Sequence, residues 1–460
     1  MPTGTNATTI TTYGSGGAGA GGTRDASAAG GSTSGGAGAA GAAGNGSAGG
    51  PIGEIIDASA PFLKFCDLPG SVRFTGTGIQ TVSGGKGVAS LAFLHIPQGF
   101  CAHYFGNIGN VRQLRFAPNG DLFVASPTKG TTGGGLNGRD AILVLPDDDH
   151  DGVADDPITF LSSLPATQGI LFANDSFYYQ DDYRLLRLPY RSGDRAPSAL
   201  GEPIADTHQT PTTGYYTSFL HWTKTLDQAD DGTIYVANGS DQEEICDVAR
   251  PFRGGIFKLD GSPAGRPVSK GFRNPAAVRC SRGHNLCFAA ELSKDYSAMD
   301  GGREKLVPIR EGDDWGFPCC ATKNVPHTDI PQQPDCSGIT PDDVSFFIGD
   351  TPFGFDFERG KWNGPHSGAV FVALHGAAGT WAGARIVVIA TDPGTGMPKP
   401  GSNVPGTSPG AMSDFATGWD DGSHANGRPA SIEFAPDGRM FVGNDNNGDI
   451  FWVAPTDLVR

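Results

Sequence analysis

A histidine and two arginines stand in the sequence where proton transfer and anion binding could be carried out. His221, in SFLHWTKTLDQADDGTIYV, comes just before a strand-turn-strand pattern, and histidine is well suited to remove a proton near neutral pH. Arg273 and Asn274 come directly before a proline in GFRNPAAV, where a helix cannot continue, so a loop would fix a guanidinium beside an amide. Arg428, in ANGRPASIEFAPDG, precedes another such pattern and could bind a carboxylate. Alternatively, His221 is an ordinary core or surface histidine. Each arginine could likewise be solvated or could stabilise a turn.

An acidic stretch, LPDDDHDGVADDP, has the spacing of a calcium loop. Asp147, Asp149, Asp151 and Asp155 follow a D-x-D-x-D-G-x-x-D arrangement. Alternate carboxylates around a glycine turn can wrap one Ca²⁺, and they would repel one another without it. The stretch lacks the glutamate at loop position 12, so it is not an EF-hand. We expect a structural calcium ion here; the alternative is a solvated acidic turn.

The elements that must position these residues are short strands joined by tight turns. A strand, a turn of the type Asn-Gly or Asp-Gly and a second strand recur at three places, and weaker copies follow at three more. The six segments are 114–126, 226–240 and 432–445, then 169–182, 278–291 and 367–376. A hairpin cannot bury its face alone, so the repeats predict an all-β fold, a six-bladed β-propeller. The alternative is a pair of β-sandwiches.

The first part of the chain has a different composition from the rest. Of its 70 glycines, many lie in the stretch GSGGAGAGG…AAGNGSAGG, which has too little apolar surface to fold. We therefore expect residues 1–55 to be a disordered Gly/Ala/Ser-rich tether, and 56–460 to be the propeller, with its core at about 91–455.

Net charge and cysteine content limit the cellular compartments and the classes of binding partner that we expect. The net charge of −16 argues against nucleic acid or an anionic membrane as a partner, and no apolar run is long enough to span a bilayer. The eight cysteines lack zinc spacing and predict up to four disulfides, with Cys280–Cys287 and Cys320–Cys336 as candidate pairs; buried free thiols are the alternative. The beginning, MPTGTNATTI, lacks the features of an export signal, yet the cysteines favour a periplasmic, envelope-tethered or secreted protein. We expect a signal upstream of this start.

The ordered set HWTKTLDQADDGTIYV, GFRNPAAV, AAELSKDY…GGREKLVPIREGDDWGFPCC and GRPASIEFAPDG resembles the soluble glucose/sorbosone dehydrogenase superfamily. These six-bladed proteins use pyrroloquinoline quinone (PQQ), and the chain looks most similar to the PQQ-dependent pyranose dehydrogenase propeller domain. The resemblance covers roughly residues 91–455. It implies that His221 takes the proton from a sugar hydroxyl while a hydride moves to the quinone, and that Arg273 donates to the quinone oxygen.

The resemblance also implies how the cofactor is held. Asn274 would lie beside PQQ, Arg428 matches the arginine that binds the cofactor carboxylate, and His375 falls near a cofactor-facing lysine. A Ca²⁺ would bridge PQQ to backbone carbonyls in the loop ELSKDY, so that Ser293 and Lys294 are its candidate ligands. This loop departs from the Gly-Pro of the glucose enzymes, and their sugar-binding glutamine has no match, so glucose itself is not implied.

The sequence thus leads to an oxidoreductase that oxidises a hydroxyl of a sugar. Its electrons would pass to an external acceptor, a cytochrome or a quinone, because the chain has no C-x-x-C-H haem motif. One alternative is a calcium-dependent propeller lactonase or esterase, although two arginines are more readily explained by an anionic cofactor. Another is a propeller that binds carbohydrate without catalysis, because a fold alone does not fix a function.

Overall fold

The described part of the chain lies within one unit that begins at Pro61 and ends at Arg460. The predicted tether, 1–55, lies outside the described residues. The computed structural model describes residues 63–86, 90–128, 137–181, 184–206, 221, 223–240, 246, 254–261, 265–294, 302–328, 330, 333–377 and 379–460.

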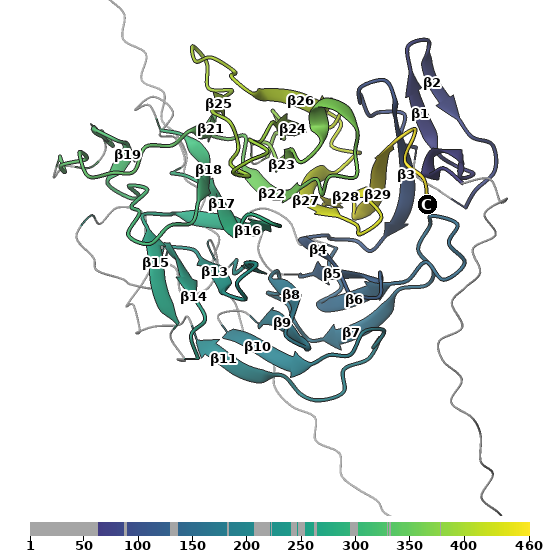
Figure 1. Ribbon diagram of the computed structural model, residues 1–460, viewed down its shortest axis with the longest axis horizontal. Coiled ribbons are helices and arrows are strands. Elements are labelled where there is room, and N and C mark those ends of the chain that lie inside the picture. The colour runs from purple at the N-terminus through teal and green to yellow at the C-terminus, as the bar shows by residue number, and fades with distance from the viewer. Residues whose placement is uncertain are drawn as a thin grey trace, which may run out of the picture. The chain divides into compact units, whose positions relative to one another are not determined.

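Six sheets, antiparallel except for the parallel pair β21–β25, form the blades of a propeller, which confirms the predicted fold class (Figure 1). In order from the inner strand outward, the first three sheets are β4 (Gln113–Phe116), β5 (Leu122–Ser126), β6 (Ala141–Leu145) and β7 (Ile158–Ser162); β8 (Ile170–Ala173), β9 (Ser176–Asp181), β10 (Arg184–Pro189) and β11 (Glu202–Asp206); and β12 (Leu226–Gln228), β13 (Ile234–Asn238), β14 (Gly255–Lys258) and β15 (Arg266–Lys270).

Two of the other three sheets carry additional strands. The three sheets are β16 (Asn274–Ser281), β17 (Leu286–Leu292), β18 (Glu304–Pro308), β21 (Val344–Phe346) and β25 (Gly401–Ser402); β22 (Pro352–Phe357), β23 (Val370–Leu374), β24 (Arg385–Ile389) and β26 (Met412–Ala416); and β27 (Arg428–Phe434), β28 (Met440–Asp445), β29 (Asp449–Pro455), β3 (Phe100–Asn107), β1 (Val72–Thr75) and β2 (Gly78–Thr81). A short hairpin, β19 (Cys320–Thr322) with β20 (Val325–Pro326), and the 3₁₀ turns η1 (Phe65–Asp67) and η3 (Gly364–His366) complete the described elements.

The last blade closes the ring by combining both ends of the unit. β3, from the start of the unit, pairs antiparallel with β29, from its end, with Tyr104 opposite Phe451. A disulfide between Cys66 and Cys101 ties the preceding 3₁₀ turn to β3. Because the first and last segments share one sheet, the propeller cannot open at this blade without breaking a complete strand pairing.

Five of the six predicted hairpins are present, and their turns explain the glycines. Gly120, Gly232 and Gly438 all adopt positive φ, between 87° and 100°, which non-glycine residues rarely tolerate. The sixth prediction was wrong in detail. Segment 367–376 contains β23 and the turn before it, and its hairpin partner is β22, which lies upstream of the segment across a long connection.

The hydrophobic core is divided among the spaces between neighbouring blades. Phe288 and Leu306 of the β16 sheet pack with Phe355 and Val372 of the β22 sheet, and comparable clusters occupy the spaces between the other adjacent blades. Middle strands such as β5, β6 and β23 are buried on both faces, because each blade has a neighbour on either side. This radial arrangement excludes the two-sandwich alternative.

Two buried arginines fill the channel between the inner strands. Arg115 of β4 donates to the carbonyls of Ile170 and Leu226, on the next two blades, at 3.3 and 3.0 Å. Arg279 of β16 donates to the carbonyl of Phe355 at 3.2 Å and pairs with Glu433 of β27 at 3.0 Å. Guanidinium groups have enough donors to serve several strands at once, so this pair cross-links the inner strands around the ring.

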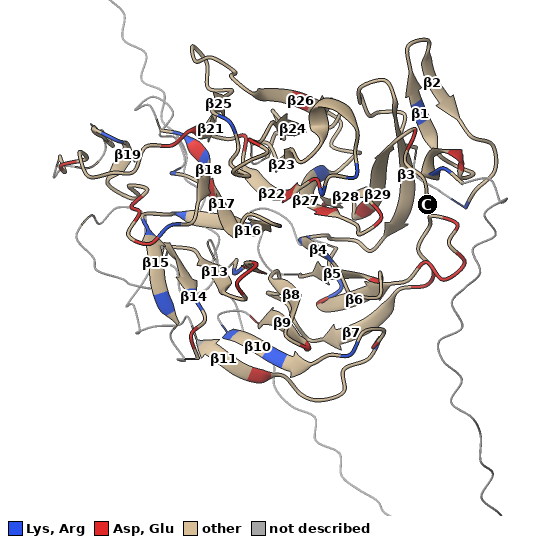
Figure 2. Ribbon diagram, in the orientation of Figure 1, with Lys and Arg blue, Asp and Glu red and all other residues tan. Residues whose placement is uncertain are grey.

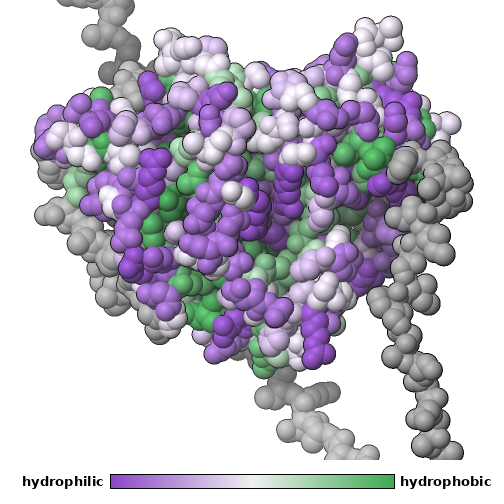
Figure 3. All heavy atoms as spheres, viewed as in Figure 1, coloured by the Kyte–Doolittle hydropathy of each residue, from purple (hydrophilic) through white to green (hydrophobic). Residues whose placement is uncertain are grey.

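The described surface is polar. Charged residues lie mainly on loops and strand edges, with an acidic stretch in the loop between β6 and β7 (Figure 2). The face seen in Figure 3 is mostly hydrophilic with small hydrophobic areas. No helix in the described segments has the length and apolar character needed to cross a bilayer.

All eight cysteines form disulfides. The candidate pairs Cys280–Cys287 and Cys320–Cys336 are confirmed. The other pairs are Cys66–Cys101 and Cys246–Cys319.

Candidate functional site

The predicted site residues lie at one end of the inner strands. Asn274 is the first residue of β16 and Arg428 the first of β27, while Arg273 directly precedes β16 and His221 lies shortly before β12. His375 follows the end of β23, which pairs with the start of β22. The structure therefore places all five residues at the same mouth of the channel.

Ser240 connects His221 to Arg273. The Nδ1 atom of His221 lies 2.8 Å from the Ser240 carbonyl, and the Ser240 N–H donates to the Arg273 carbonyl at 2.7 Å. A carbonyl can only accept, so Nδ1 carries the proton and Nε2 carries the lone pair. Burial and the positive charge of Arg273 lower the pKa of His221 to about 3. At neutral pH the imidazole is thus an uncharged base.

A buried glutamate that the sequence analysis missed supports the arginine. Oε1 of Glu291 accepts the backbone N–H of Arg273 at 2.7 Å, and burial raises the pKa of Glu291 to about 8. On the other side, Oδ1 of Asn274 accepts from the Thr223 hydroxyl at 2.9 Å. The loops before β12 and β16 are therefore joined through their polar side chains. The only sequence signal for Glu291 is its place in AAELSKDY, at the end of a strand.

Asp445, at the end of β28, gathers the cations on the facing side of the mouth. Its Oδ1 accepts from Nε of Arg428 at 3.1 Å, its Oδ2 lies 2.7 Å from Nε2 of His375, and Arg112 approaches at 3.7 Å. Burial opposes ionisation, but His375 and Arg428 hold the pKa of Asp445 well below its usual range. Burial and the charge of Arg428 lower the pKa of His375 to about 4. Asp445 and Arg112 were not predicted; Asp445 ends β28 and Arg112 directly precedes β4, and neither stands in a recognisable motif.

The two groups of polar residues are joined by a small apolar cluster. Ala276, Leu292, Phe353 and Ala430 are buried together, from three successive blades. Arg112 lies over the Phe353 ring at 4.9 Å from its centroid. This packing fixes the backbone beside Asn274 and Arg428. Arg273 and Arg428 are therefore held by backbone segments that cannot easily shift.

The mouth contains buried acceptors that the protein itself does not satisfy. Within the described residues, no partner is found for Oε1 of Gln168, Oε2 of Glu291 or the hydroxyl of Thr167, although all three atoms are buried. Gln168 belongs to the β8 blade and donates to the Ala276 carbonyl at 3.2 Å, so it reaches across the mouth. Buried polar atoms without partners are rare and call for a ligand, ion or water. Orphaned oxygens beside buried arginines fit a ligand with carboxylates and a cation.

Ser293 and Lys294 are the calcium ligands expected from the resemblance, and the structure describes both. Both follow the end of β17, are buried, and lie next to Asn274 through the pairing of Leu292 with that residue. Backbone oxygens suit Ca²⁺, a hard cation that prefers oxygen ligands.

The acidic loop between β6 and β7 forms a separate cluster. Carboxylate oxygens of Asp147, Asp149 and Asp151 come within 4.8 Å of one another, as a cation site requires. Asp155 has another contact: its Oδ2 accepts the backbone N–H of Asp148 at 2.9 Å. Lys86 pairs with Asp149 and Asp151 at 2.7 and 2.8 Å. The structure thus brings together three of the four predicted residues and adds a lysine that the sequence analysis missed.

The acidic loop packs at the closing blade. Gly152 of this loop accepts from the indole of Trp452, on β29, at 3.0 Å. Trp452 in turn stacks on His103 of β3. An ion bound here would brace the blade that closes the ring.

Comparisons with known proteins agree with this architecture. Residues 88–274 match the model of a domain of unknown function, DUF7133. No curated protein matches the chain. A Trichoderma reesei protein of carbohydrate-active enzyme family AA12, with iodide and calcium structures, is 16% identical with a TM-score of 0.64, over 79% of this chain and 97% of that one. The holo PQQ domain of pyranose dehydrogenase from Coprinopsis cinerea is 15% identical with a TM-score of 0.63, over 78% and 96%.

A bacterial protein shows the same likeness at a lower level. The apo form of the soluble aldose sugar dehydrogenase from Escherichia coli is 12% identical with a TM-score of 0.55, over 77% of this chain and 99% of that one. At such identities the likeness concerns the fold. The resemblance expected from the sequence is thereby confirmed at that level: this chain has the six-bladed propeller fold of the pyranose and aldose sugar dehydrogenases.

Proposed function

We propose that the protein is a PQQ-dependent dehydrogenase that oxidises a hydroxyl of a sugar, either a pyranose or a ketoaldose. The observation that carries the proposal is the linkage of His221 through Ser240 to Arg273. It places a neutral base next to a buried cation at the channel mouth. The solved structures that share the fold include a pyranose dehydrogenase PQQ domain and an aldose sugar dehydrogenase, which supports the same chemistry.

The position of each residue in the site indicates its proposed role. Nε2 of His221 accepts the proton of the sugar hydroxyl, because Nδ1 is committed to the Ser240 carbonyl. PQQ, when bound, would supply the quinone that accepts the hydride. Arg273 donates to the quinone oxygen on which charge develops, and Asn274 orients the ring beside it. His375 and Arg428, anchored on Asp445, hold a carboxylate of the cofactor.

Two calcium ions belong to the proposal. One is held near the cofactor by the backbone carbonyls of Ser293 and Lys294, where it polarises the quinone. The other is structural and is bound by Asp147, Asp149 and Asp151, with Asp155 as a support of the loop. The first ion is required for cofactor binding and the second for stability.

The location and partners follow from the same features. Four disulfides are typical of an oxidising compartment, so the protein works in the periplasm, on the envelope or outside the cell. The electron acceptor is a separate molecule, a cytochrome or a quinone.

Reconstitution tests the proposal directly. Purified protein is titrated with PQQ and Ca²⁺, and a panel of aldoses and ketoaldoses is added while the quinone absorbance is followed. We expect stoichiometric cofactor uptake, bleaching with at least one sugar, and loss of bleaching but not of uptake in His221→Ala. Failure to take up PQQ would overturn the proposal. Ca²⁺-dependent hydrolysis of a lactone or ester without PQQ would favour the hydrolase alternative, and sugar binding without either activity would favour the binding module.

A further inference from the structure

A second cavity lies at the opposite mouth of the channel. It has a volume of about 490 Å³, within the range of small-molecule sites. Its residues come from the far ends of the inner strands, such as Ser281 of β16 and Phe357 of β22, whereas Asn274 and Arg428 begin their strands. Asn274 and Ser281 are the two ends of β16, seven positions apart, a separation of roughly 23 Å along a strand. The cavity is thus distinct from the candidate redox site.

Arginines and carboxylates from several blades converge on the cavity floor. Arg115 and Asp227 are buried in the floor, 3.6 Å apart. Arg282 reaches Asp227 at 3.5 Å from the β16–β17 turn, and Arg359 reaches Asp356 at 3.5 Å from the end of β22. These side chains meet from four different blades, which is a pattern of a built polar site rather than of scattered surface charge.

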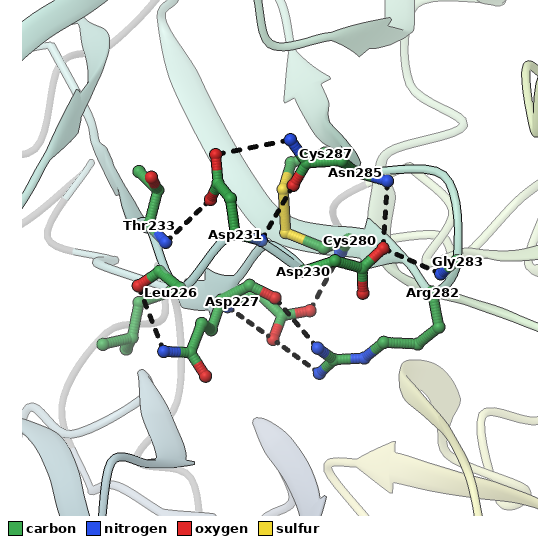
Figure 4. The surroundings of a disulfide bond; sticks show 12 residues. Leu226, Asp227, Asp230, Asp231, Thr233, Cys280, Arg282, Gly283, Asn285 and Cys287 are labelled. Atoms are coloured by element: carbon green, nitrogen blue, oxygen red, sulfur yellow. Dashed lines mark hydrogen bonds and ion pairs between the residues drawn. A yellow bond between two sulfur atoms is a disulfide. The ribbon is translucent and has the colours of Figure 1, made fainter.

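The β16–β17 turn holds Arg282 rigidly in place (Figure 4). The Cys280–Cys287 disulfide closes this turn, and Oδ2 of Asp230, on the neighbouring blade, accepts the N–H groups of Gly283 and Asn285 at 2.8 and 3.0 Å. Nη1 of Arg282 donates to the Gln228 carbonyl at 3.0 Å. A side chain on so constrained a turn is pre-organised, which lowers the entropic cost of binding.

The carboxylates of the cavity are already satisfied by backbone donors. Oε1 and Oε2 of Glu358 accept from the N–H groups of four residues, at 2.5 to 2.8 Å. Asp227 accepts from the N–H of Cys280, Asp356 from that of Phe434, and Asp392 from those of its own turn. These groups therefore have little capacity left for a cation or a hydroxyl ligand.

The guanidinium groups, in contrast, keep donors available. Arg359 forms ion pairs with Asp356 at 3.5 Å and with Glu433 at 3.6 Å, both longer than a good hydrogen bond, and the charge of Asp227 also acts on it. Its side chain is 32% exposed and that of Arg282 is 52% exposed. Lys399 adds a further cation at the wall. Arginine presents five donors in a fork that matches carboxylate and phosphate groups.

We propose that this cavity binds a small anion carrying a phosphate or carboxylate group, with Arg359 and Arg282 as its principal ligands. Hydrogen-bond donors, and not net charge, favour an anion here, since the cations and carboxylates around the cavity nearly balance. It is independent of the redox chemistry at the other mouth. The protein would then have two ligand sites, one at each end of its channel.

Isothermal titration of the full chain with inorganic phosphate, and separately with citrate, tests the proposal. Both titrations are run at ionic strength fixed with sodium chloride, because unspecific anion effects do not saturate. We expect saturable binding of at least one of the two probes, and the stronger probe identifies whether phosphate or carboxylate is recognised. Arg359→Gln and Arg282→Gln should each raise the dissociation constant about tenfold or more, the loss of affinity expected when a charged hydrogen bond is removed.

A matched control separates the site from general charge. Arg266 lies on β15, is exposed and pairs with Glu311 at 2.8 Å, so Arg266→Gln removes the same charge away from the cavity and should change affinity less than twofold. If Arg359→Gln disturbs folding, as circular dichroism would reveal, the more exposed Arg282→Gln decides. Absence of saturable binding for both probes, or equal affinities in Arg282→Gln and Arg266→Gln, would overturn the proposal.

Discussion

Nε2 of His375 lies 2.7 Å from Oδ2 of Asp445, and this carboxylate also holds Arg428 through its other oxygen. His375 follows the end of β23, and Arg428 begins β27, so one side chain fixes the geometry between two blades. Such an anchor does not touch the substrate. It decides, however, whether a guanidinium and an imidazole point toward the same ligand.

Replacing this anchor should be costly. Asp445→Asn removes the negative charge from three cationic or polar partners, and the free energy of unfolding should fall by about 3 to 5 kcal/mol, the usual cost of breaking a buried pair. Urea unfolding followed by tryptophan fluorescence measures this change. Asp414→Asn, which removes the exposed partner of Arg385, should cost less than about 1 kcal/mol. Equal costs for the two variants would show that Asp445 is no anchor.

Arg273 should affect cofactor reduction more than cofactor retention. Its donation strengthens as charge builds on the quinone, so Arg273→Ala should slow the sugar-driven bleaching of bound PQQ by roughly 10²- to 10³-fold, as for the loss of an oxyanion donor. The dissociation constant for PQQ should rise much less. Stopped-flow bleaching and equilibrium titration give the two values. A parallel loss in both would mean that Arg273 only binds the cofactor.

His221 should make the protein less stable in acid. Its pKa is about 3 in the folded state, below the ordinary 6.5, so between these values the unfolded chain binds a proton that the folded chain does not. Above pH 6.5 the buried imidazole costs the folded state nothing. As the pH falls from 6.5 toward 3, the free energy of unfolding decreases. His221→Gln should reduce the slope of unfolding free energy against pH by about 1.4 kcal/mol per unit between pH 4 and 6. Urea melts across this range check it; an unchanged slope would contradict the buried, neutral imidazole.

The sequence was sufficient for the repeating part of the fold because turn chemistry is local. Gly120, Gly232 and Gly438 mark hairpins through their positive φ, and a repeated hairpin predicts radial stacking. The β22–β23 hairpin was misplaced because its connection is long, and its Asn363-Gly364 pair leads into η3 rather than directly into a strand. Local patterns carry no information on a hairpin whose connection is long.

The candidate site was predictable only in part, for a related reason. His221, Arg273 and Arg428 stand in recognisable motifs, whereas Asp445 and Glu291 act through partners that are distant in the sequence. Arg428 and Asp445 are brought together by the pairing of β27 with β28, yet nothing in either strand marks the aspartate as shared with His375. Such contacts appear only once the blades are closed into a ring.

The acidic loop should respond to calcium. Ca²⁺ should raise the midpoint of thermal unfolding and EGTA should lower it, because Asp147 and Asp151 approach one another at the closing blade. Asp151→Asn should abolish the response, and Lys86→Met should strengthen it by removing a competing cation. Differential scanning calorimetry without PQQ provides the measurement. A response that survives in Asp151→Asn would assign the ion to another place.

The channel arginines should behave as a single cross-link. Arg279→Met leaves the Phe355 carbonyl without its donor and Glu433 with a weaker set of partners, so unfolding free energy should fall by about 3 to 5 kcal/mol. Arg187→Met, at an exposed pair with Glu202, should change it by less than about 1 kcal/mol.

A double-mutant cycle then distinguishes pairing from packing. Adding Glu433→Gln to Arg279→Met removes the buried charge that has lost its closest ion-pair partner, so the double variant should be more stable than the sum of the single losses predicts. Burial already raises the pKa of Glu433, so a neutral side chain at this position costs less free energy than a carboxylate when the ion pair is removed. Additive losses, measured by urea unfolding, would mean that Arg279 stabilises the ring through its carbonyl contacts alone.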